Sequence, residues 1–186
     1  IEQAGVEIPH TAFEDSQLQE IFDAAVNSYR QNATDIFMDC PSRERAGWLC
    51  DSFFTGRCEY AFTGENRVET SYLENFYKTD RFIMNPEAPK GIVPMLYPGD
   101  TNYIGGSEYI INWNFWGIIE TAEYAQLRNG DREVVENLRS VVYGILGAVK
   151  PFENEFGLIE NMPGWIFVEW SRANDKDVTC GVSFPS

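Results

Sequence analysis

Two joints in this sequence are so short that the segments around them are restricted to helical hairpins. The spacing of apolar residues predicts helices at about 112–128 and from Asp131 to Pro151, connected only by the turn at 129–131. Gly64-Glu65 forms a similar joint between helices predicted at about 46–62 and 66–79. Helices connected by so few residues lie antiparallel against each other. The sequence therefore predicts an architecture of helical hairpins.

The rest of the chain adds one further helix and little strand. Residues 16–31 have the apolar spacing of a helix, and a capping box is expected at Ser16 and Gln19. Asn66 and Glu69 are similarly placed to cap the helix at 66–79. A long ordered loop, rich in proline and glycine, is predicted between the two hairpins, and such loops are usually functional. Short extended or single-turn pieces are expected at 92–97, 157–160 and 165–170. The predicted fold class is all-α.

The acidic composition argues against several classes of partner. The 186 residues include 14 Lys and Arg against 29 Asp and Glu, a formal net charge of −15. Such a chain lacks the basic face that binds nucleic-acid phosphates, and it is unsuited to an anionic membrane surface. Its apolar runs are also too short to span a bilayer. We therefore expect neither a nucleic acid nor a membrane as partner.

The chain begins at Ile1 and ends at Ser186, without an initiator methionine, a leader or a targeting motif. We expect residues 1–186 to form a single segment of a larger polypeptide. The single histidine is His10, and the cysteine spacing matches no zinc pattern, so no metal or other cofactor is predicted. Buried free thiols are the simplest interpretation of the four cysteines, which are Cys40, Cys50, Cys58 and Cys180.

Candidate chemistry is concentrated between Asp39 and Asp51. If the helix starts near Glu44, then Glu44, Trp48 and Asp51 lie on one of its faces, and Asp39 can fold back towards them. Carboxylates beside an indole suit a sugar, because they accept hydroxyl hydrogen bonds while the ring packs on the apolar sugar face. The alternative is a solvated helix start with surface salt bridges. Likewise, Trp113, Trp116, Trp165 and Trp170 are either aromatic walls or ordinary core residues.

A carboxyl group that protonates a glycosidic oxygen must keep its proton near neutral pH. Neighbouring carboxylates and burial against Trp48 would raise the pKa of such a group, whereas Arg43 and Arg45 would lower it if they point inwards. The sequence leaves the outcome of this competition open.

The pattern Asp-Cys-Pro-x-Arg-Glu-Arg-x-Gly-Trp-x-x-Asp at 39–51 resembles the catalytic signature of the inverting α-L-rhamnosidases of glycoside hydrolase family 78. Later segments at 97–100, 112–116, 152–155 and 165–170 are similar to stretches of the same family, so the resemblance covers most of the chain. It implies an (α/α)6 barrel, in which inner and outer helices are linked as hairpins.

Position by position, the resemblance implies that Glu44 is the general acid and that Asp39 and Asp51 hold rhamnose hydroxyls. It also implies that aromatic walls of the sugar pocket are formed by Trp48, Trp113 and Trp165. The substrate would be a rhamnose-containing glycoside, and a periplasmic or extracellular location follows from the family alone.

The general base of this family lies in later helices of the barrel, and no residue here matches it. Candidates by residue type alone are Glu120, Glu153, Glu155, Glu160 and Glu169. We therefore expect the first half of a catalytic domain, inactive by itself and able to self-associate through exposed apolar helix faces. Three alternatives stay open, namely a non-catalytic sugar-binding protein on the same fold, a glycosidase or sugar phosphorylase for another glycone, and a purely structural helical module.

Overall fold

The computed structural model describes residues 8–9, 11–78, 88–99, 109–165 and 167. These residues form five α-helices followed by a short 3-10 helix, and their only β pairing consists of isolated bridges. The elements are α1 (Ser16–Asn32), α2 (Leu49–Thr63), α3 (Arg67–Lys78), α4 (Ile111–Leu127), α5 (Arg132–Val149) and η2 (Lys150–Phe152). The predicted all-α class is confirmed.

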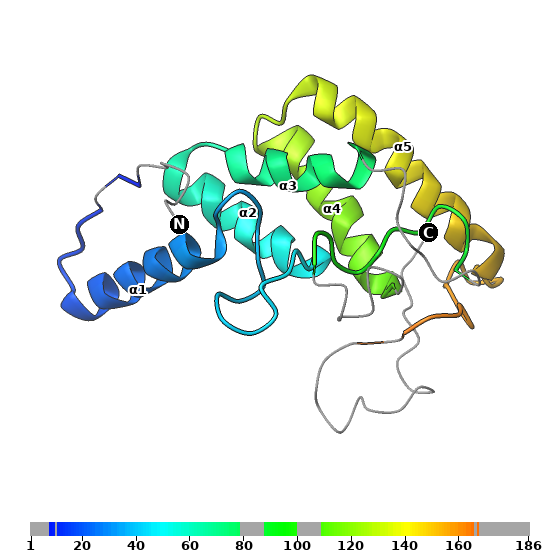
Figure 1. Cartoon of the computed structure of the whole chain (residues 1–186), viewed down its shortest axis with the longest axis horizontal. Helices are drawn as coiled ribbons and strands as arrows, with labels where there is room; N and C mark the ends of the chain where they lie inside the picture. Colours follow the sequence, from blue (N-terminus) through cyan, green and yellow to red (C-terminus); the bar gives the residue numbers. More distant parts are fainter. Residues whose placement is uncertain (1–7, 10, 79–87, 100–108, 166, 168–186) are drawn as a thin grey trace.

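The helices after α1 form two hairpins that lie side by side (Figure 1). The α2–α3 hairpin turns at Gly64, whose φ of 69° is the left-handed conformation that glycine adopts without strain. The α4–α5 hairpin turns at 129–131, and the Asp131 carboxylate caps α5 by accepting from two backbone N–H groups. Between hairpins, α2 packs mainly on α4 and α3 mainly on α5. The chain therefore forms two layers, one containing α2 and α4 and the other containing α3 and α5.

The two layers differ in how apolar side chains are distributed around their helices. In α3 and α5 the buried residues fall on one stripe, as expected for helices with a solvated outer face. In α2 and α4 apolar side chains lie on several faces, and Phe54, Ile119 and Leu127 are exposed. None of the helices in the described part of the chain is long and apolar enough to cross a membrane.

Two predicted helix caps are wrong. Asp15, rather than Ser16, caps α1, and its carboxylate accepts from the N–H groups of Gln17 and Leu18. At α3 the cap comes from the preceding helix, because the buried Glu59 carboxylate accepts from Val68 N (2.8 Å) and Glu69 N (2.9 Å).

The predicted α3 caps have other partners. Asn66 donates its amide to the Arg128 carbonyl, and the Glu69 carboxylate binds the Arg128 guanidinium. Both contacts connect the first hairpin to the end of α4. The residues predicted to cap α3 therefore hold the two hairpins together.

The start of α2 also differs from the prediction. The helix begins at Leu49, and Trp48 is its N-cap in an extended conformation, paired with Leu96 in an isolated antiparallel bridge. Arg45 is in the left-handed region with a φ of 51°, which interrupts any helix running from Glu44. The expectation that Glu44, Trp48 and Asp51 share one helix face is therefore wrong, since only Asp51 lies within α2.

We expect Glu59→Gln to lower the free energy of unfolding by about 1–2 kcal/mol, the usual effect of losing a helix N-cap. The amide offers one acceptor oxygen to two backbone N–H groups and buries a donor that needs its own partner. Urea denaturation of the full-length protein measures the change. The control is Glu136→Gln, since Glu136 is exposed and forms an ion pair with Arg139 of the same helix. Equal effects of the two substitutions would contradict the capping role.

Candidate functional site

The loop that precedes α2 is closed by Asp39 and Ala46. The Asp39 N–H donates to the Ala46 carbonyl (3.1 Å), and the Ala46 N–H donates to Asp39 Oδ1 (3.1 Å). Inside the loop, the Glu44 N–H donates to Cys40 Sγ (3.3 Å). These bonds form the fold-back that the sequence predicted for Asp39. They place the Asp39 carboxyl beside the loop residue Glu44.

The exit of this loop is anchored to residues 95–98. Gly47 N donates to the Pro98 carbonyl, and Tyr97 N donates to the Gly47 carbonyl, both at 2.9 Å. A Cβ at Gly47 would lie 2.5 Å from the Tyr97 carbonyl oxygen, so this close approach requires glycine. Leu49 N also donates to the Met95 carbonyl at 2.9 Å. Trp48 therefore lies between Gly47 and Leu49, whose backbones are both hydrogen-bonded to residues 95–98.

Three carboxyl groups meet at this loop. Burial raises the pKa of Glu44, and a hydrogen bond to Asp39 and the charge of Asp39 raise it further. Burial and the charge of Asp39 also raise the pKa of Asp51, to about 6, with a smaller contribution from Glu44. Mutual effects of this kind require the three groups to lie close together. The structure thus brings Asp39, Glu44 and Asp51 together, although not through the predicted helix face.

The structure also decides the competition around Glu44. Arg43 Nη2 lies 2.5 Å from Glu44 Oε1 and lowers the pKa of this carboxyl, as does the nearby indole of Trp48. The Arg43 side chain is 75% exposed, whereas that of Glu44 is 13% exposed, so water screens the guanidinium. Burial and Asp39 prevail, and the net shift is upward.

Three predicted aromatic residues lie against one small cluster. Trp48, Trp113 and Trp165 pack on the buried side chains of Ala46, Met95, Leu96 and Ile110. Phe167 lies between two of them, with ring centroids 5.3 Å from those of both Trp113 and Trp165. Phe167 was missed as a candidate, although it stands in the aromatic segment that the sequence singled out. Trp116 is elsewhere, packed on Phe53 between α2 and α4.

Of the glutamates considered as the general base, two bind other side chains and two are exposed to solvent. Glu120 is completely buried and bonded to Ser52, and Glu153 pairs with Lys150. Glu155 and Glu160 are exposed. Glu169 and Trp170 lie outside the described residues. Among the interactions of the described residues, none of these four glutamates contacts Asp39, Glu44 or Asp51.

Within the described ranges, no group of three or more His, Cys, Asp or Glu side chains is arranged to hold a metal ion. Cys40, Cys50 and Cys58 are free thiols as predicted, but their predicted burial is wrong, since Cys40 and Cys50 are half-buried and Cys58 is exposed. Cys180 lies outside these ranges. What the described part of the site offers is therefore a group of carboxyls next to indole rings.

The family model of the bacterial alpha-L-rhamnosidase 6 hairpin glycosidase domain matches residues 11–179. The chain belongs to this family. The match includes both hairpins and the whole 39–51 loop, so the predicted rhamnosidase family is confirmed, as is the six-hairpin glycosidase fold. No curated protein and no solved structure matches the chain.

We expect Asp39→Asn to lower the pKa of Asp51 from about 6 towards the ordinary aspartate value, because the substitution removes a neighbouring negative charge. Carbon-13 NMR of labelled aspartate carboxyls in the full-length protein measures this pKa. Asp35→Asn is the matched control, since Asp35 is exposed and bonds to its neighbour Thr34. An Asp51 pKa that is the same in wild type and Asp39→Asn would show that the carboxyls do not interact.

Proposed function

We propose that this chain is part of the catalytic domain of an inverting glycoside hydrolase that removes terminal α-L-rhamnose, with Glu44 as the general acid. The observation that carries the proposal is the position of the Glu44 side chain, which is largely buried beside Asp39; burial and this neighbour raise its pKa. A general acid must be protonated in the free enzyme near its working pH. Membership of the rhamnosidase family supports the choice of rhamnose as the sugar.

In the proposed reaction, Glu44 transfers its proton to the glycosidic oxygen as the bond from that oxygen to the anomeric carbon breaks. A water attacks the anomeric carbon from the opposite ring face and loses a proton to the general base. The products are rhamnose of inverted anomeric configuration and the free alcohol. Asp39 and Asp51 would accept hydrogen bonds from sugar hydroxyls, with Trp48, Trp113 and Trp165 packing against apolar parts of the sugar.

We propose that the general base is supplied by a part of the polypeptide outside residues 1–186. The other surroundings of Glu120, Glu153, Glu155 and Glu160 support this assignment. So do the exposed apolar residues of α2 and α4, where further helices can pack. The second candidate function is non-catalytic sugar binding on the same fold, which the lack of a matching base favours.

Glu44→Gln in the full-length protein is expected to abolish cleavage of rhamnosides with poor leaving groups. Aryl rhamnosides with activated leaving groups should be affected much less, because departure of their aglycone needs little protonation. Comparing kcat/KM for the two substrate types tests this, with Glu136→Gln as a surface control. Equal losses on both types would contradict the acid role, and rhamnose binding without any turnover in wild type would favour the binding protein.

Trp48→Ala is expected to weaken L-rhamnose binding by about tenfold or more, since it removes a ring of the proposed sugar wall. Isothermal titration calorimetry with the full-length protein measures the affinity. Tyr143→Ala is the control, because Tyr143 is 64% exposed on α5, away from the loop. An unchanged affinity in a folded Trp48→Ala protein would assign Trp48 to the core instead.

A further inference from the structure

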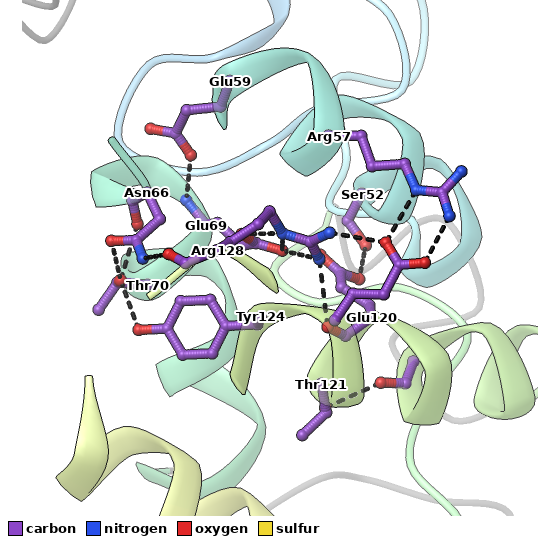
Figure 2. Close-up of polar contacts among 12 residues, drawn as sticks. Ser52, Arg57, Glu59, Asn66, Glu69, Thr70, Glu120, Thr121, Tyr124 and Arg128 are labelled. Carbon is purple, nitrogen blue, oxygen red and sulfur yellow. Dashed lines mark hydrogen bonds and ion pairs between the residues drawn. The ribbon is translucent and has the colours of Figure 1, made fainter. Parts of the chain in front are cut away.

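A buried polar network connects α2, α3 and α4 (Figure 2). Its centre is Arg128, which is 3% exposed and binds Glu69 through two nitrogens, with Nη2 2.6 Å from Oε1 and Nε 2.8 Å from Oε2. Arg128 Nη1 also donates to Glu123, which receives a second ion pair from Arg57. The two arginine charges are thus occupied by Glu69 and Glu123.

Glu120 lies in the same network, and within the described part of the chain no Lys or Arg forms an ion pair with its carboxyl group. Its side chain is completely buried, and Arg128 donates to its backbone carbonyl rather than to the carboxyl. Glu120 Oε2 is 2.6 Å from Ser52 Oγ, whereas Glu120 Oε1 has no hydrogen-bond partner among the described residues. An ionised carboxylate in this setting would be destabilising, because its charge is buried and Arg128 acts on it only from a distance, without a direct ion pair among the described residues.

The hydroxyl of Ser52 limits how this contact can be made. Ser52 Oγ is 2.8 Å from the Leu49 carbonyl and 2.6 Å from Glu120 Oε2, but a serine hydroxyl carries only one hydrogen. If Glu120 were ionised, both neighbours would be acceptors and one of these short contacts would lack a proton. If Glu120 is protonated, it donates to Ser52 Oγ, and the serine hydrogen remains for Leu49. Only the protonated form satisfies both contacts.

These contacts reach the backbone on both sides of Trp48. Ser52 fixes the Leu49 carbonyl in the first turn of α2, and the buried Tyr72 hydroxyl donates to the Gly47 carbonyl at 3.1 Å. The Ser52 hydroxyl also faces Tyr72 and lowers its pKa, against a larger rise from burial. Asp51 follows Leu49 by two residues in the same turn. A change in the Glu120–Ser52 contact would therefore shift Trp48 and the Asp51 carboxylate in the candidate site.

We propose that Glu120 is a positioning residue, held as a neutral carboxylic acid that donates to Ser52 and thereby fixes the first turn of α2 beside Trp48 and Asp51. Its importance for sugar recognition rests on the function proposed above, whereas its protonation does not. The ionisable groups that face it are Cys50 on α2, Glu69 and Tyr72 on α3, Glu123 on α4, and Arg128. Burial, the largest influence, raises the pKa of Glu120 well above its ordinary value.

Infrared difference spectroscopy of the full-length protein at neutral pH tests the protonation. Wild type minus Glu120→Gln should show the carbonyl stretch of one protonated carboxylic acid, a band that an ionised glutamate lacks. Wild type minus Glu123→Gln should lack it, because two arginines hold the pKa of Glu123 at about 2. Absence of the band from the first difference spectrum would overturn the proposal.

Hydrogen–deuterium exchange measures the positioning itself. Glu120→Gln retains a donor towards Ser52 and should leave exchange in the first turn of α2 unchanged, whereas Glu120→Leu should raise it by about tenfold. If Glu120→Leu does not fold, Ser52→Ala replaces it with the same expectation. Equal exchange in the Gln and Leu variants would overturn the positioning role.

Measuring the affinity for L-rhamnose tests whether the Glu120 network affects the candidate site. We expect the Gln variant to bind like wild type and the Leu variant about tenfold more weakly. Equal affinities in the Gln and Leu variants would restrict Glu120 to a structural role and overturn the positioning of the site. If wild type itself binds no rhamnose, the proposed function fails, while the infrared and exchange results still decide the state and role of Glu120.

Discussion

The pair of hydrogen bonds between Asp39 and Ala46 is the interaction on which the candidate site depends. One bond joins two backbones, and the other uses the Asp39 carboxylate, so the same residue closes the loop and contributes charge to it. Closure holds Glu44 beside Asp39 and directs the chain into Trp48 and α2. Without it, the hydrogen bond to Asp39 and the charge of Asp39 would no longer raise the pKa of Glu44. Burial would then be the remaining cause that raises it.

The hairpins provide the frame that this loop needs. Pairing of α2 with α4 accompanies the packing of Trp48 and Trp113, which are distant in the sequence, against one buried cluster. This packing buries several carboxyl groups, which are accommodated in three different ways. Glu59 caps α3, Glu69 binds Arg128, and Glu120 contacts Ser52. Each solution connects two helices, so the polar interior contributes to the alignment of the layers as well as to its own stability.

The hairpin architecture could be predicted from the sequence because its signals are local. Gly64 and Asp131 end and begin helices through their own backbone or side-chain chemistry, and both are confirmed at these positions. The start of α2 could not be predicted, since it depends on the pairing of Trp48 with Leu96, which two helices separate in the sequence. The Glu59 cap was missed for a similar reason, because a glutamate inside one helix gives no sign that it serves the next.

The candidate carboxyls were identified from residue type and family resemblance, yet their convergence arises from loop geometry rather than from helix periodicity. What the sequence left open was the balance between Arg43 and Asp39 at Glu44, because that balance depends on which side chain is buried. The structure exposes Arg43 and largely buries Glu44. Exposure weakens a salt bridge, whereas proximity to Asp39 in a partly desolvated loop strengthens the effect of like charge.

The most direct test of this account is the pKa of Glu44 itself, measured by carbon-13 NMR of labelled glutamate carboxyls in the full-length protein. The Glu44 resonance is assigned by its loss in Glu44→Gln. We predict a pKa above the ordinary glutamate value of 4.5, so that Glu44 retains its proton to higher pH than an exposed glutamate. A pKa at or below 4.5 would show that Arg43 dominates, and it would contradict the assignment of Glu44 as the general acid.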